Sequence, residues 1–109
     1  MASDPAHDTI CDAIRARRLL MFAYGGLVRV VEPHLLGTNT AGHEALSAWL
    51  RPGHSRSTPQ GGWRMYRLDG VSALQLLDEP FPGPRPGYNP GDPSFAAVHC
   101  SLPVLAAER

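Results

Sequence analysis

Two arginines alternate with aromatic side chains in one short stretch, residues 63–71, which reads WRMYRLDGV. Alternate side chains of a β-strand share a face, so Arg64 lies with Tyr66 and Leu68 on what we expect to be the buried face. An arginine there permits two interpretations. Its stem could pack on the core with the guanidinium in water or paired with a carboxylate, or the guanidinium could bind a phosphate or carboxylate at the rim of a pocket.

Other residue types that do chemistry are present but lack the spacing that chemistry requires. His99 and Cys100 are adjacent, so in a strand they point to opposite faces, and Cys11 lies far away in the sequence. The chain has no Cys-x-x-Cys or His-x-x-x-His pair, no nucleophile elbow and no phosphate-cradling glycine loop. We therefore expect no metal, no cofactor and no enzymatic activity.

Composition points to one folded domain with balanced charge. The chain has 109 residues, of which 43% are hydrophobic and 18% are charged, as in globular proteins. Ten basic residues, all of them arginine, balance ten acidic ones, so the formal net charge is zero. Without an overall basic field, any binding of nucleic acid must come from a local cluster of arginines.

The sequence also indicates a cellular compartment. No apolar run approaches the roughly 20 residues needed to span a bilayer, and the first residues, MASDPAHD, lack the pattern of a signal peptide. We expect a cytoplasmic protein without membrane contact. In that compartment Cys11 and Cys100 would be reduced, partly buried thiols.

Apolar periodicity predicts one helix followed by short strands. Residues 9–18 have a helical stripe, with Asp8 or Thr9 as the cap. Alternation around Gly25-Gly26 predicts a hairpin, because such a pair suits a tight turn. The remaining predicted strands cover residues 43–51, 63–69 and 71–77. One helix and about five strands predict a mainly β protein, a small antiparallel sheet that curls into a barrel.

The composition changes after residue 77. Residues 78–95 contain six prolines, which excludes regular structure, and residues 95–102 offer a last short strand. We expect an extended segment packed across the barrel, against the alternatives of a free linker or a proline-rich ligand for another domain. The predicted organisation is a flexible N-terminus (1–8), a barrel domain (9–81) and the Pro/Gly-rich segment with its final strand, packed on the barrel (82–109).

The order of these pieces resembles the WYL domain of bacterial transcriptional regulators. The matching segments, within residues 10–81, are AIRARRLLMFAY, VEPHLLG, AGHEALSAWL and WRMYRLDGVSALQLLDEPF. The resemblance implies an Sm-like, SH3-type barrel that acts as a sensor or effector-binding domain. For some members it implies nucleotide or single-stranded nucleic-acid ligands.

Two departures from the family pattern concern the ligand. Glu44, Ala45 and Leu46 stand in place of the Trp-Tyr-Leu triplet, and Gly70 replaces a second motif arginine. With apolar faces aligned, we expect Leu46 opposite Leu68 and Glu44 opposite Gly70. A carboxylate there would repel phosphate, so binding should be weak, and the double change Glu44→Trp and Gly70→Arg should improve it.

These observations lead to a functional prediction with one alternative. We expect a non-enzymatic module, with a role in transcriptional regulation, that binds an anionic ligand weakly. The ligand-binding residues would be Arg64, Arg29, Tyr24, Glu44 and Tyr66. The alternative is a protein–protein interaction or homo-oligomerisation module without a nucleic-acid ligand. Its partner, a second copy or a regulator, would cover an exposed edge strand with Trp49 and Trp63 as anchors.

Overall fold

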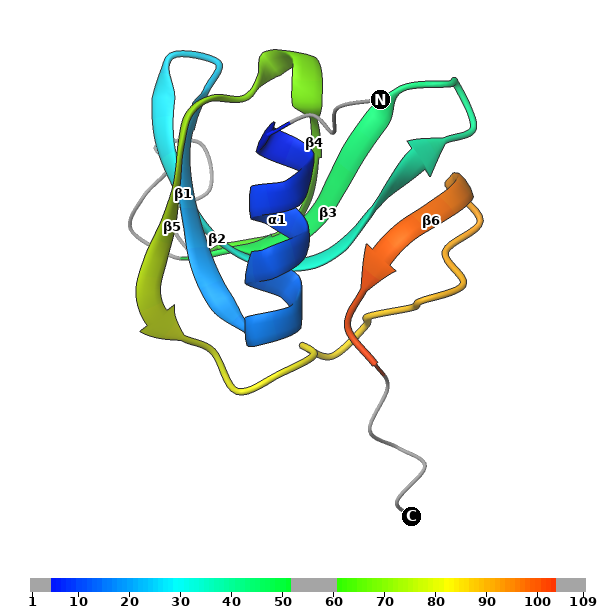
Figure 1. Ribbon diagram of the computed structural model, residues 1–109. Helices are drawn as coiled ribbons and strands as arrows, with labels where there is room; N and C mark the ends of the chain where they lie inside the picture. The colour runs from blue at the N-terminus through cyan, green and yellow to red at the C-terminus, as the bar shows by residue number, and fades with distance from the viewer. Residues whose placement is uncertain (1–4, 52–60, 104–109) are drawn as a thin grey trace.

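The structure, a computed structural model, describes residues 5–51 and 61–103. They form one helix, six strands and a single 3₁₀ turn (Figure 1). The elements in chain order are α1 (Pro5–Ala16), β1 (Arg18–Tyr24), β2 (Leu27–Asn39), β3 (Glu44–Leu50), β4 (Gly62–Arg67), the turn η1 (Leu68–Gly70), β5 (Ser72–Pro80) and β6 (Phe95–Ser101).

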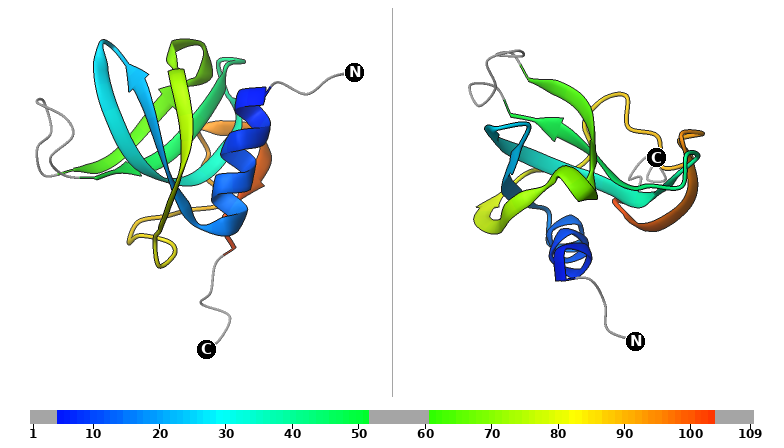
Figure 2. Two further views of the ribbon diagram at one scale, coloured as in Figure 1. Left: turned by 60° about the vertical axis from the view of Figure 1, so that its left-hand side comes forward. Right: turned by 90° about the horizontal axis from the view of Figure 1, so that it is seen from above.

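All six strands belong to one antiparallel sheet with the order β4-β3-β2-β1-β5, and β6 pairs with β2. The prediction of a mainly β fold with one N-terminal helix is confirmed. The prediction of a closed barrel is wrong: within the described ranges no ladder joins β4 to β5, so the curled sheet stays open (Figure 2). The turn η1 separates these two strands, and β6 takes the far half of the β2 edge, which β1 does not reach.

The first hairpin follows its local sequence. Tyr24 pairs with Leu27 around Gly25 and Gly26, as predicted. Both glycines have positive φ, 61° and 80°, the backbone shape that a two-residue turn between twisted strands requires. The strand therefore places Tyr24 at the end of the hairpin, next to its turn.

The helix is longer at its start than the sequence indicated. It begins at Pro5 instead of residue 9, because proline suits the first helical turn, where its missing N–H needs no partner. It ends at Ala16, two residues earlier than expected, where Arg17 adopts a left-handed φ of 55°. The predicted apolar stripe is buried in the core that α1 shares with the sheet: Ile10, Ala13 and Ile14.

A disulfide joins Cys11 of α1 to Cys100 of β6. The expectation of two reduced thiols is therefore wrong. The two residues are 89 positions apart in the sequence, but α1 packs beside β6 and brings their Cα atoms to 5.7 Å. Among the described helices, none is long and apolar enough to cross a membrane.

The proline-rich segment between β5 and β6 lies against the sheet (Figures 1 and 2). The Trp63 indole donates to the carbonyl of Pro86 at 3.0 Å. The Tyr88 hydroxyl donates to the carbonyl of Leu102 at 2.8 Å. Phe81, just before the segment, is 3% exposed. Side-chain hydrogen bonds, one from the sheet and one from the segment itself, thus hold in place a segment that has no ladder of its own.

Candidate ligand-binding site

Four of the five predicted ligand-binding side chains come together between the β1–β2 pair and the β3–β4 pair of strands. Tyr24 ends β1, Arg29 lies in β2, and Arg64 and Tyr66 lie in β4. The two tyrosine rings meet edge to face with centroids 4.9 Å apart. Both guanidinium groups lie close enough to act on the charge of the Tyr66 hydroxyl. We call these four residues the Arg–Tyr cluster.

The Tyr66 hydroxyl is buried at the centre of this cluster. The residue is 2% exposed, and the hydroxyl has no hydrogen-bond partner among the described residues. Burial raises the pKa of Tyr66, while the positive charges of Arg29 and Arg64 act to lower it. A buried hydroxyl without a partner costs about 1–3 kcal/mol of folding free energy.

Backbone carbonyls orient both arginines. The Nε and Nη2 groups of Arg29 donate to the Tyr24 carbonyl at 3.3 and 3.2 Å. Nη1 of Arg64 donates to its neighbouring Trp63 carbonyl at 2.7 Å. A guanidinium has five N–H donors in a planar fork, so a contact to one carbonyl oxygen sets the direction of the charged plane.

Arg64 lies in part on the core side of its strand, which answers the question raised by the sequence. It is partly buried, and the same face carries fully buried Ala48 and Tyr66. The neighbouring positions Met65 and Arg67 are exposed. Arg64 also contributes to a groove of about 230 Å³ between β4 and the proline-rich segment. Other residues that line this groove are Leu35, Ser47, Trp63, Met65 and Tyr88.

Glu44 lies apart from the Arg–Tyr cluster. Its carboxylate accepts a hydrogen bond from the Thr38 hydroxyl and lies beside His7 and His99. The expected pairing of Glu44 with Gly70 is wrong, because β4 ends at Arg67 and the chain turns away in η1.

The predicted register has the correct parity and the wrong offset. Leu46 pairs with Tyr66 instead of Leu68, a shift of two residues that keeps every side chain on its expected face. A Cβ on Gly70 would lie 2.8 Å from Cε1 of Tyr24. The change Gly70→Arg would therefore push into the cluster that it was expected to improve.

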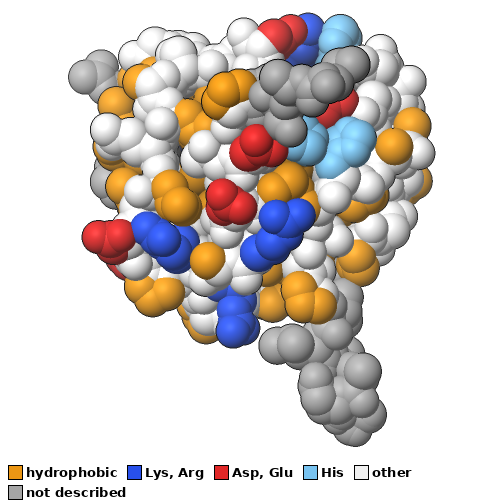
Figure 3. All heavy atoms as spheres, in the orientation of Figure 1, with side chains coloured by type: hydrophobic (Ala, Val, Ile, Leu, Met, Phe, Trp, Pro, Cys, Tyr) orange, Lys and Arg blue, Asp and Glu red, His pale blue; other side chains and the backbone are white. Residues whose placement is uncertain are grey.

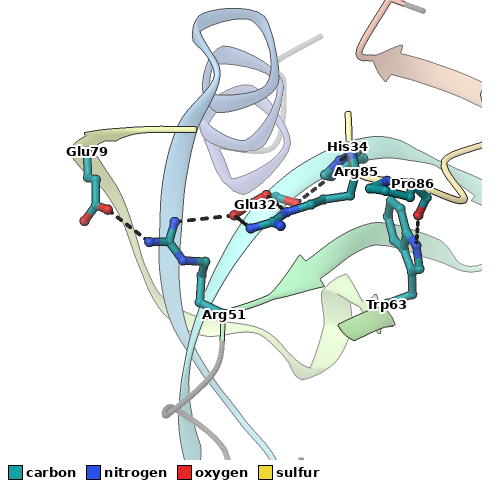
Figure 4. A network of polar contacts seen from close by, with 7 residues as sticks. All are labelled: Glu32, His34, Arg51, Trp63, Glu79, Arg85 and Pro86. Atoms are coloured by element: carbon teal, nitrogen blue, oxygen red, sulfur yellow. Dashed lines mark hydrogen bonds and ion pairs between the residues drawn. The ribbon is translucent and has the colours of Figure 1, made fainter. Parts of the chain in front are cut away.

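A second polar group of residues was missed by the sequence analysis (Figure 4). Glu32 is fully buried, and its carboxylate accepts two hydrogen bonds from the Arg85 guanidinium, at 2.8 and 2.9 Å. Arg51 adds a contact to the same carboxylate at 3.4 Å. His34 is also fully buried and contacts the backbone of both Glu32 and Arg85. We call Glu32, His34 and Arg85 the tail network.

The hydrogen bonds of His34 define its protonation. Nε2 accepts from the backbone N–H of Arg85 at 3.1 Å, so Nδ1 carries the proton and donates to the Glu32 carbonyl at 2.8 Å. Burial lowers the pKa of His34, which keeps the ring neutral. One signal in the sequence was overlooked: Glu32 and His34 are polar residues, two positions apart, in the otherwise apolar run of residues 30–36.

The fold and the Arg–Tyr cluster together describe a β-rich domain with cations and tyrosines on the inside of its curl. The structure is similar to part of proteasome accessory factor B/C (PafBC) of Arthrobacter aurescens, with a TM-score of 0.62 and 26% sequence identity. The match covers 77% of this chain and 13% of the PafBC chain. No family model and no curated protein matches the sequence.

Proposed function

We infer that this chain is a regulatory ligand-binding domain of the WYL type, and that it binds an anionic nucleotide or single-stranded nucleic acid without catalysing a reaction. The similarity to PafBC, a transcriptional regulator that contains a WYL domain, supports this assignment. The chain corresponds to a small part of that protein, so its place in a regulatory pathway is part of the proposal. The sheet would be a divergent form of the Sm-like, SH3-type barrel, left open between β4 and β5.

The observation that carries this proposal is the buried Tyr66 hydroxyl beside two arginines. A phosphate or carboxylate oxygen that binds here would accept charge-assisted hydrogen bonds from the guanidinium groups of the partly buried Arg29 and Arg64, and a movement of the side chains that cover the 2% exposed Tyr66 would bring its hydroxyl into the same contact. The partly exposed ring of Tyr24 offers an aromatic surface on which a base can stack. The cluster thus combines the two features that hold nucleotides, charge and stacking.

Binding of mononucleotides and short single-stranded DNA, measured by calorimetry at several salt concentrations, tests the proposal. We expect weak binding by the wild type that falls steeply with salt, because phosphate contacts release counterions. Arg64→Ala and Arg29→Ala should each weaken binding about tenfold, the loss of about 1.4 kcal/mol. Arg67→Ala is the matched control: this exposed arginine is on the opposite face and pairs with Asp69. Equal effects of Arg64→Ala and Arg67→Ala would contradict the proposal.

The open sheet supports the second candidate, a protein interaction module. Within the described part of the chain, β4 and β5 each pair with one strand, so each has a free edge that a partner strand can join. Trp49 and Trp63, the predicted anchors, contact this chain's own segment: Arg85 lies 5.0 Å over the Trp49 ring, and Trp63 binds Pro86. A partner would therefore use an edge rather than the indoles, and its binding would depend little on salt.

A cytoplasmic location is a further part of the proposal and follows from its regulatory role. The disulfide between Cys11 and Cys100 argues against it, since such bridges persist mainly in oxidising compartments. Labelling of free thiols in cells lysed directly into denaturant, which exposes the buried Cys11 and Cys100, distinguishes the two cases: labelled cysteines support a reducing compartment, and unlabelled ones contradict it.

A further inference from the structure

Three segments that are distant in the sequence meet at one place on the molecule. They are the first turn of α1 with His7, the start of β3 with Glu44, and the middle of β6 with His99. Pairing brings β3 and β6 to the same part of β2, because Thr38 is aligned with Glu44 on one side and with Ala97 on the other. Figure 3 shows histidine side chains gathered beside an acidic side chain on this face of the molecule.

The side-chain donor atoms of these three residues lie within 4.8 Å of one another. Oε1 of Glu44 is 3.7 Å from Nε2 of His7 and 3.1 Å from Nε2 of His99. Bonds of about 2.0–2.2 Å around a tetrahedral Zn²⁺ place ligand atoms about 3.4 Å apart. The two distances from Glu44 lie on either side of this value, and with all donor atoms within 4.8 Å of one another, movements of the side chains alone would complete the geometry. We propose that His7, Glu44 and His99 bind a divalent transition-metal ion, with Zn²⁺ as the expected occupant.

The two oxygens of Glu44 support this assignment because their surroundings differ. Oε2 accepts a hydrogen bond from the Thr38 hydroxyl, which orients the carboxylate in the manner of an outer-shell partner of a metal site. Oε1 is shielded from solvent although the side chain as a whole is 41% exposed, and it faces Nε2 of both imidazoles without a well-aligned hydrogen bond among the described residues. A shielded carboxylate oxygen needs a positive partner, either a protonated imidazole or a bound cation, and the proposal assigns the cation.

The orientation of His7 fits the same site, and Nε2 of His99 faces it too, although that nitrogen lies 3.1 Å from the Thr38 hydroxyl, a contact that a bound ion would replace. Nδ1 of His7 faces the sulfur of Cys11 at 4.0 Å, so its other nitrogen, Nε2, is the one directed to Glu44. Cys11 lies one helical turn after His7, and Cys100 directly follows His99. The disulfide between these cysteines therefore fixes the distance between the two elements that carry the imidazoles.

The donor set determines the class of ion. Two imidazoles with one carboxylate suit Zn²⁺ and neighbouring transition metals, whereas Mg²⁺ and Ca²⁺ prefer a shell of oxygen atoms. Three protein ligands leave a fourth position for water, and the exposed His99 would leave that position open to solvent. The sequence analysis expected no metal because the histidines and cysteines have no metal-binding spacing. His7, Glu44 and His99 come together only in the fold.

Calorimetric titration of the untagged, oxidised, chelator-treated chain with zinc chloride tests the proposal. We expect about one equivalent of zinc to bind and to raise the melting temperature. His99→Ala and Glu44→Gln should each weaken zinc binding at least about tenfold. His43→Ala is the control, because this histidine precedes Glu44 in the sequence but lies outside the cluster. A control that loses as much affinity as His99→Ala would overturn the site.

A second measurement does not depend on how well the variants fold. Zinc added to the ¹⁵N-labelled wild type should shift the Nε2 resonances of His7 and His99 and leave those of His34 and His43 unchanged. Shifts confined to other histidines, or zinc affinity weaker than about 1 mM, would overturn the proposal. If the carboxylate only forms ion pairs with the protonated imidazoles, these two Nε2 resonances will respond to pH and not to zinc, which also overturns it.

Discussion

The two faces of β4 carry polar groups of opposite character. Side chains alternate along the strand, so Trp63 points to the face of the tail network while Arg64 points to the face of the Arg–Tyr cluster. In the tail network, the buried carboxylate of Glu32 has cationic partners on both oxygens, and His34 uses both ring nitrogens. In the Arg–Tyr cluster, a buried hydroxyl has no partner within the described residues.

This difference separates a structural role from the binding role that we propose. A buried polar group that is fully hydrogen-bonded can hold elements in place, and here it holds the proline-rich segment on the sheet. A buried group without a partner weakens the fold unless a ligand supplies the missing contact. The first face thus has the contacts of a structural element, and the second has the unsatisfied group on which the proposed binding role rests.

The largest expected effect comes from removing the main partner of the buried carboxylate. Arg85→Ala should lower the free energy of unfolding by about 3 kcal/mol, because Glu32 would lose its two-pronged partner and keep only the longer contact to Arg51. Urea denaturation measures this loss. Arg67→Ala, which breaks an exposed ion pair, should change stability by less than about 0.5 kcal/mol. Similar losses in the two variants would remove the structural role of the tail network.

A smaller effect should follow from acidification. The pKa of His34 is lowered from 6.5 in the folded state, so the unfolded chain takes up the proton first as the pH falls. Neutral His34 contributes its full stability above about pH 6.5. This stability is lost as the pH falls from 6.5 through the lowered pKa of the folded state. The loss is about 1.4 kcal/mol for each unit by which folding lowers the pKa.

Unfolding by urea between pH 8 and pH 5 would measure this dependence. His34→Gln should weaken the pH dependence of stability, because glutamine does not titrate. The other histidines are the same in the variant and the wild type, so the difference between the two curves reports His34. An equally steep loss in wild type and variant would show that other groups cause it.

The smallest expected change in stability comes from removing one tyrosine hydroxyl, and the two faces should respond to it in opposite ways. Tyr88→Phe should destabilise the protein by about 1 kcal/mol, because the Tyr88 hydroxyl donates to the Leu102 carbonyl at 2.8 Å. Tyr66→Phe should leave stability unchanged or raise it slightly, because it removes a buried hydroxyl without a described partner. Thermal melts of the two variants compare these outcomes, and nucleotide binding should fall only in Tyr66→Phe. A clear loss of stability in Tyr66→Phe would mean that the protein itself satisfies this hydroxyl.

Local features of the fold could be predicted from the sequence alone. Period-two alternation and the Gly25-Gly26 pair determine the first hairpin, because they act through neighbouring residues and through the sterics of a single turn. The same alternation determined the parity of the β3–β4 pairing, and it brought Arg64 and Tyr66 to one face. The approach of this pair to Tyr24 and Arg29 depends on the curl of the sheet, since β4 does not pair with β1 or β2 in the described residues.

The features that the sequence did not reveal depend on contacts between distant segments. The offset of β4 against β3, the open edge between β4 and β5, and the bond between Cys11 and Cys100 follow from how far the sheet curls and where α1 packs. The same holds for Arg85 on Glu32, 53 residues apart, and for the meeting of Glu44 with two histidines. Such pairs have no periodic signal, since their partners are chosen by the shape of the folded chain and by the need to satisfy each buried charge.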